Sequence, residues 1–224
     1  MLPYGDRSGS ACNLATRSAV GSLVEGHLGA ASSPMALPQG LYRIVLRALR
    51  ILSPVLTKGE SKLARGLRGR RDAHERLAAA ATPLAGRPVL WVHASSVGES
   101  LQARAVIDVL RRRMPGLRVV FTFFSPSADV VQGTFPADVS SYLPWDLPEV
   151  MRPVLDAVQP DVIVFTQREV WPTLAEEAAA RGVPTVLIAG TMPQGSGRLS
   201  WPGRILLGPA FRSLRAVAAI SQED

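Results

Sequence analysis

Short hydrophobic runs alternate with amphipathic segments from Val89 to the end of the chain. We predict strands at residues 89–93, 118–123, 139–143, 161–166, 185–189 and 217–220, and helices at residues 99–114, 147–158 and 172–181. Strands that are almost wholly apolar, separated by helices, are typical of a parallel sheet with helices on both faces. The pattern therefore predicts an α/β, Rossmann-like domain over residues 88–224.

Residues 41–56 follow a different pattern, in which a narrow basic stripe interrupts a broad apolar surface. On a helical wheel Arg43, Arg47 and Arg50 lie on the same side. A helix of this length reaches about 24 Å, which is less than the roughly 30 Å of a bilayer's hydrocarbon layer. Two interpretations remain open: a helix that lies in the membrane surface, or an amphipathic helix that packs on the domain itself.

The formal net charge is +7, and most of the excess lies between Arg43 and Arg87, where eleven Arg and Lys accompany three acids. A basic segment beside an apolar helix suits an anionic membrane surface. Because no groove-reading motif accompanies these cations, we expect no nucleic-acid partner. We predict an amphipathic helix and a basic membrane-proximal segment over residues 35–87.

Residues 1–34 are rich in Gly, Ser and Ala without a sustained period, and we predict a flexible leader there. They lack the apolar core of a secretory signal. Cys12 is the only cysteine, and His27, His74 and His93 stand far apart in the sequence. We therefore expect no metal site and no cofactor.

Three segments directly follow predicted strands, at the edge where open α/β sheets bind ligands. The first is residues 93–99, where small residues let the backbone approach a ligand and the next helix offers free N–H groups. Glu99 lies at the start of that helix. It is either a favourable acid at a helix N-terminus or a general base.

The second segment is residues 122–128, in which Ser125 precedes Pro126 and fits the cap and first position of a helix. The third is residues 166–172, a polar cluster beside Trp171. It either lines a polar cleft or forms a strand-to-helix turn with a satisfied ion pair.

In this order the segments resemble the N-terminal domain of Kdo (3-deoxy-D-manno-octulosonic acid) transferases. That family carries a short membrane-associated helix, then H-A-x-S-x-G-E, a T-x-T-P-T-like turn, Y-L-P-x-D-L-P, E-T-E-[LI]-W-P-N and A-x-S-x-E-D. The corresponding residues here are 93–99, loosely 122–127, and then 142–148, 167–173 and 219–224.

The resemblance implies the N-terminal half of a GT-B glycosyltransferase of lipopolysaccharide biosynthesis, which transfers Kdo from CMP-Kdo to a lipid A precursor. It implies a location at the cytoplasmic face of the bacterial inner membrane, attached peripherally or monotopically. It also implies that Glu99 is the catalytic base. The substrate-binding residues implied by the same motifs are His93, Ser96, Gly98, Ser125, Ser127, Gln167, Glu169 and Trp171.

Three departures from the family pattern matter. Gln167 replaces a Glu that we associate with transition-state stabilisation, and residues 189–196 lack most polar groups of the family's N-[AG]-R-[LI]-S-x-R-S stretch. The sequence stops where the linker to a nucleotide-binding domain begins in the family. We therefore expect transfer only together with a C-terminal half. The alternative is a non-catalytic lipid- or membrane-binding remnant of such a transferase.

Overall fold

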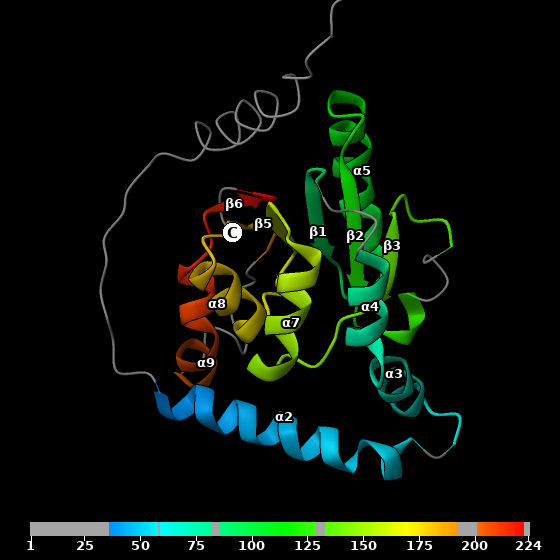
Figure 1. Cartoon of the computed structure of the whole chain (residues 1–224). Helices are drawn as coiled ribbons and strands as arrows, with labels where there is room; N and C mark the ends of the chain where they lie inside the picture. The colour runs from blue at the N-terminus through cyan, green and yellow to red at the C-terminus, as the bar shows by residue number, and fades with distance from the viewer. Residues whose placement is uncertain (1–35, 58, 82–85, 129–132, 192–200, 222–224) are drawn as a thin grey trace, which may run out of the picture. The chain divides into compact units, whose positions relative to one another are not determined.

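The computed structural model describes residues 36–57, 59–81, 86–128, 133–191 and 201–221 (Figure 1). Residues Met35–Asp224 form one compact unit. The predicted flexible leader, residues 1–34, lies outside the described residues. The boundary predicted between residues 87 and 88 stays a prediction.

Within the described residues, the strands form one sheet in the order β3-β2-β1-β4-β5-β6, and every neighbouring pair is parallel. The bounds are β1 Val89–His93, β2 Arg118–Phe123, β3 Val139–Tyr142, β4 Val162–Thr166, β5 Thr185–Gly190 and β6 Ala216–Ala219. The predicted parallel sheet is confirmed. The strand order reverses between β1 and β4, and open α/β sheets bind ligands at such a switch point.

Helices cover both faces of the sheet. Successive strand residues point to opposite sides, and both sides carry apolar side chains that the helices bury. Trp91 of β1 packs in a core with Met151, whereas its neighbour Val92 packs in another core with Ile107. The first face carries α4 Ala73–Ala81, α7 Pro148–Val158, α8 Pro172–Ala180 and α9 Trp201–Arg212, and the second carries α5 Val97–Arg113. The Rossmann-like arrangement predicted for this chain is therefore present.

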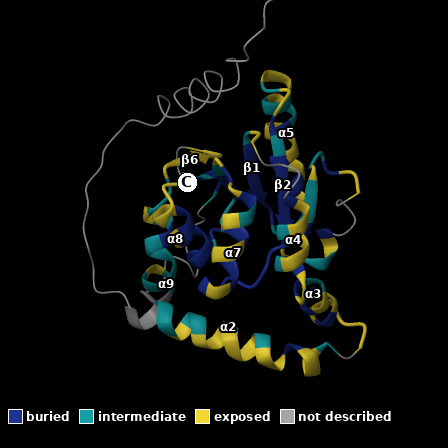
Figure 2. Ribbon diagram, in the orientation of Figure 1, coloured by how far each residue is buried: buried dark blue, intermediate teal, exposed yellow. Residues whose placement is uncertain are grey.

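Helix α2, Ala36–Leu56, packs on the domain through its polar stripe. The Arg47 guanidinium pairs with both carboxylate oxygens of Glu149 on α7 at 2.8 and 3.0 Å. Arg43 pairs with Glu176 on α8 at 2.6 Å. The arginines thus face the protein, and the opposite, apolar side of α2 is largely exposed (Figure 2). None of the described helices has the length and apolar character needed to cross a membrane.

Three helices were missing from the sequence prediction: α4, α9 and α3, Lys62–Arg70. The buried side of α3 consists of Ala64, Gly66, Leu67 and Arg70, so it contains one large apolar side chain and no apolar period. Helix α9 also lacks a regular apolar period, because its sequence contains glycines and has Pro209 inside the helix. After β2 the described part of the expected helix is a short 3-10 turn, Pro126–Ala128, and residues 129–132 lie outside the described residues.

Candidate functional site

Glu99 lies at the switch point, between the carboxyl ends of β1 and β4. Its Oε2 accepts a hydrogen bond from the backbone N–H of Ser95 at 2.7 Å. The Thr166 hydroxyl, at the end of β4, lies 3.2 Å from the same oxygen and 3.0 Å from the carbonyl oxygen of His93. Ser96 caps α5 and accepts the backbone N–H of Glu99 at 3.4 Å. Both central strands therefore hold this one carboxylate.

The environment of Glu99 favours its protonated form. The residue is only 9% exposed, and this burial raises the pKa of its carboxyl above the ordinary value. The hydrogen bond from Ser95 opposes the shift, and the nearby Glu169 carboxylate adds to it. A carboxylate whose pKa moves toward neutrality is a better general base at physiological pH.

His93, the last residue of β1, is fully buried and bonded at both ring nitrogens. The indole Nε1 of Trp171 donates to Nε2 at 2.8 Å. Nδ1 lies 3.1 Å from the hydroxyl oxygen of Thr122, which also accepts the indole N–H of Trp91 at 2.9 Å. Burial lowers the pKa of His93 to about 3, so the ring is neutral. His93 joins the walls of the site and keeps no ring nitrogen free for a ligand.

An aromatic ring at the surface extends this network. Phe124 lies at a ring-centroid distance of 5.0 Å from Trp171. The Arg70 guanidinium lies 3.7 Å from the Phe124 centroid and donates to the Phe124 carbonyl oxygen at 2.8 Å. Burial lowers the pKa of Arg70 to about 10. A buried cation over an aromatic face is a strong local interaction, and it fixes Phe124 beside the site.

Gln167 adopts the left-handed backbone region, with φ of 54°. Its backbone N–H donates to the Ile188 carbonyl oxygen at 2.9 Å, and its side-chain amide donates to Oε1 of Gln102 at 3.1 Å. Gln102 lies on α5, one turn after Glu99. The residue that departs from the family pattern therefore lies at the same switch point and pairs with a second amide.

The remaining predicted site residues surround this centre. Gly98 is exposed in the first turn of α5, and a side chain built there meets nothing within 4 Å. The hydroxyl groups of Ser125 and Ser127 lie 2.8 Å apart after β2. The backbone N–H of Ser125 donates to the carbonyl oxygen of Ser95 at 3.0 Å, which ties the two segments together. The predicted residues are thus brought together, while their roles toward a substrate stay predictions.

Sequence reasoning missed four contributors to the site: Arg70, Phe124, Thr166 and Gln102. Thr166 and Phe124 belong to segments that the sequence predicted to line the site, but other residues of these segments were predicted to bind the substrate. Gln102 follows Glu99 at helical spacing, which is a usable signal. For Arg70 the sequence offers no signal, because it is one of many arginines in a basic segment.

Asp146, from the Y-L-P-x-D-L-P motif, is a buried structural residue. Its carboxylate accepts the backbone N–H groups of Thr173 and Leu174, at the start of α8, at 2.9 and 2.8 Å. It also accepts the hydroxyl of Tyr42 on α2 at 2.9 Å. Because Trp171 immediately precedes α8, this carboxylate connects α2 to the segment that contacts His93.

Among the described residues, no group of three or more His, Cys, Asp or Glu is arranged to hold a metal ion. What the site offers is a partly shielded carboxylate, neutral amides, hydroxyl groups and exposed aromatic surface. Such groups can bind a polyhydroxylated molecule and accept a proton from one of its hydroxyl groups.

The sequence profile of the 3-Deoxy-D-manno-octulosonic-acid transferase (kdotransferase) family matches residues 71–224. The 3-deoxy-D-manno-octulosonic acid transferase of Bordetella pertussis is 30% identical over 198 residues, which cover 83% of this chain and 45% of the relative. That of Haemophilus influenzae is 34% identical over 100 residues, which cover 44% of this chain and 23% of the relative. The chain thus spans less than half the length of these relatives.

Solved structures resemble this chain only loosely. Acinetobacter baumannii MurG matches with a TM-score of 0.43 and 11% identity, over 59% of this chain and 41% of MurG. A putative UDP-N-acetylglucosamine 2-epimerase from Listeria monocytogenes matches with a TM-score of 0.47 and 8% identity, over 61% of this chain and 39% of the epimerase. The fold assignment therefore depends on the strand pairing itself.

Proposed function

Because this chain belongs to the 3-deoxy-D-manno-octulosonic-acid transferase family, we propose that it is the acceptor-binding half of a Kdo transferase. Its substrates are CMP-Kdo as donor and a lipid A precursor as acceptor, in lipopolysaccharide synthesis. A C-terminal half, from the same longer protein or from a second chain, binds the donor nucleotide in a GT-B arrangement.

The placement of Glu99 carries this proposal. Its carboxylate lies at the switch point of the sheet and is held by Ser95 and Thr166 from two adjacent strands. In the proposed reaction it takes the proton of an acceptor hydroxyl group while that oxygen bonds to the anomeric carbon of Kdo. The bond from this carbon to the CMP phosphate breaks, and CMP leaves with the electron pair. The raised pKa of the Glu99 carboxyl suits this transfer.

The exposed side of α2 supports a peripheral or monotopic location at the cytoplasmic face of the bacterial inner membrane. Five large apolar residues of this helix are more than half exposed: Leu41, Ile44, Ile51, Leu52 and Val55. An apolar surface of this kind favours insertion into the headgroup region of a bilayer. The ion pairs of Arg43 and Arg47 hold the opposite side of the helix on the domain.

The test is a reconstituted transfer reaction. The purified chain, in detergent, is mixed with the C-terminal half of a related transferase, CMP-Kdo and lipid A precursor, and the lipid product is analysed by mass spectrometry. We expect a Kdo-bearing product that Glu99→Gln reduces by about 100-fold or more, because general-base catalysis contributes on that order. The matched control is Glu60→Gln, which removes the same charge from an exposed residue.

One observation favours the alternative of a non-catalytic lipid-binding remnant. Gln167 replaces a carboxylate with a neutral amide, and its side chain donates to Gln102. The same experiment separates the two functions. Lipid binding without any Kdo transfer, in the wild-type chain and in Glu99→Gln alike, establishes the remnant and rejects the transferase.

A further inference from the structure

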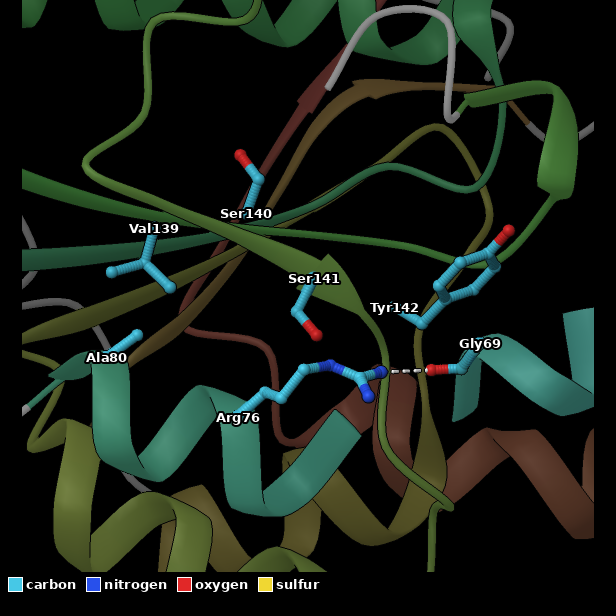
Figure 3. Close-up of a pocket in the computed structure, with 7 residues that line it drawn as sticks. All are labelled: Gly69, Arg76, Ala80, Val139, Ser140, Ser141 and Tyr142. Carbon is cyan, nitrogen blue, oxygen red and sulfur yellow. Dashed lines mark hydrogen bonds between the residues drawn. The ribbon is translucent and has the colours of Figure 1, made fainter. Parts of the chain in front are cut away.

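A cavity of about 300 Å³ lies between α4 and the edge strand β3, apart from the Glu99 site (Figure 3). It is lined by Gly69, Arg76, Ala80, Val139, Ser140, Ser141 and Tyr142. The lining contains one guanidinium group, two serine hydroxyl groups and an aromatic ring, and it contains no carboxylate. Its volume is at the lower end of the range found for small-ligand sites.

The hydroxyl group of Ser141 has no hydrogen-bond partner in the part of the chain that the structure describes. The residue is 7% exposed. A buried hydroxyl without a partner is costly, and nearly all such groups in proteins are satisfied. Figure 3 shows this hydroxyl directed from β3 toward the side chain of Arg76 on α4. Ser141 and Arg76 therefore place a hydroxyl group without a partner and a cation on facing elements.

Arg76 makes one short hydrogen bond and one long ion pair. Its Nη2 donates to the Gly69 carbonyl oxygen at 2.6 Å, while Nη1 lies 3.8 Å from the Asp72 carboxylate. The side chain is about half exposed and already lines the cavity, so its guanidinium is within reach of a ligand there. A guanidinium carries five N–H donors in a fork that matches the oxygens of a phosphate or carboxylate.

We propose that this cavity binds the phosphate group of a phosphorylated ligand. The Arg76 guanidinium exchanges the Gly69 carbonyl for phosphate oxygens, and the Ser141 hydroxyl donates to the same group. The remaining volume, beside the Tyr142 ring, accommodates the organic part next to the phosphate. If the chain acts on a lipid A precursor, the phosphate is the one carried by that headgroup; this assignment alone rests on the proposed function.

Binding is measured on the full chain without any transfer reaction. One arm titrates inorganic phosphate by calorimetry, and the other uses detergent micelles containing a phosphorylated glucosamine lipid or its dephosphorylated form. We expect Arg76→Gln and Ser141→Ala each to weaken phosphate binding roughly tenfold or more, the loss typical of a hydrogen bond to a charged group. The matched control is Arg112→Gln, which removes an exposed charge from α5, on the other face of the sheet.

Ser141→Ala also guards against a folding artefact. It removes a hydroxyl that has no partner, so the thermal midpoint without ligand stays equal to or above that of the wild type. Phosphate affinity that is unchanged in both variants, or that falls equally in Arg112→Gln, overturns the site.

Preference for the phosphorylated lipid identifies the headgroup as the source of the phosphate. Equal binding of both lipids, with intact binding of inorganic phosphate, overturns that assignment. A failed transfer reaction with intact phosphate binding counts against the proposed function alone.

Discussion

The indole N–H of Trp171 donates to Nε2 of His93 across 2.8 Å, and this bond decides which nitrogen of the buried ring carries the proton. Since Nε2 accepts, the proton of the neutral ring is on Nδ1, which donates to Thr122. The bond joins the segment after β4 to the end of β1, and Thr122 continues it into β2. Three neighbouring strands are thereby fixed beside Glu99.

Trp171→Phe tests this bond. The ring stays aromatic, but the buried Nε2 of His93 loses its short bond from the indole and keeps only the longer contact with the Ser95 hydroxyl at 3.4 Å. We expect this to cost about 1–3 kcal/mol of unfolding free energy. Urea denaturation measures the loss, and nitrogen NMR of the imidazole reports the tautomer. A variant with wild-type stability and an unchanged Nδ1–H tautomer contradicts the assignment.

The neutral state of His93 makes the fold sensitive to acid. Its pKa is lowered from 6.5 to about 3 in the folded chain. Between these values the unfolded state binds more protons, so the unfolding free energy falls as the pH decreases, by up to about 1.4 kcal/mol per pH unit. We expect His93→Asn to remove this part of the pH dependence between pH 6.5 and 3, as measured by urea denaturation. The control, His74→Asn, leaves the dependence in place, and an identical pH dependence in wild type and His93→Asn contradicts the prediction.

Tyr42→Phe tests the connection between α2 and the start of α8. The buried Asp146 carboxylate keeps its donors on Thr173 and Leu174 but loses the Tyr42 hydroxyl, which costs about 1–3 kcal/mol at neutral pH. Hydrogen exchange in α2 is expected to accelerate. A double-mutant cycle with Asp146→Asn isolates the pair. Additive effects in that cycle show that the two residues are not coupled.

The pKa of Asp146 predicts a second pH dependence, of opposite sign. Burial raises this pKa from 3.8 to about 6, so between these values the folded chain binds more protons than the unfolded chain. The contribution of Asp146 to stability is therefore present below pH 3.8 and is lost as the pH rises through 6. Asp146→Asn is expected to remove this decline in urea denaturation. If the unfolding free energy of the variant still declines as the pH rises through 6, another group causes the decline.

Gly69→Ala tests the packing of α3 on β3. A methyl group at this residue collides with the Tyr142 ring, and overpacking of this kind costs about 1–3 kcal/mol. Gly40→Ala is the matched control, because Gly40 also lies in a helix but a methyl group added there meets nothing within 4 Å. There the better helix propensity of alanine raises stability by about 0.5–1 kcal/mol. Equal shifts in the two thermal midpoints refute this packing.

Ile51→Glu tests membrane attachment by α2. Ile51 is 76% exposed, so the substitution leaves the unfolding free energy within about 0.5 kcal/mol of the wild type. It places a charge in the middle of the apolar side, and we expect binding to phosphatidylglycerol-containing vesicles in a flotation assay to be lost. Leu101→Glu changes an equally apolar residue, 58% exposed on α5, and is expected to float normally. Unaltered flotation of Ile51→Glu rules out this side of α2 as the attachment surface.

The sequence by itself determined those helices and strands whose pattern of apolar and polar residues shows which side is buried. The strand at residues 89–93, apolar except for His93, and the helix after it were predictable, because buried strands and amphipathic helices require particular residue types at fixed spacing. The start of that helix made Glu99 a candidate, while its role as a base came only from the resemblance to Kdo transferases. The helix at residues 62–70 was not, because small residues and an arginine form its buried side.

Only the tertiary structure decided what each of these elements meets. It places Thr166 against Glu99, Trp171 against His93 and Tyr42 against Asp146, from segments far apart in the chain. It also decides that the arginine stripe of α2 faces the domain while the apolar side faces outward. Periodicity defines the two sides of a helix, but the carboxylates that attract the basic side lie more than a hundred residues away, so only folding brings them together.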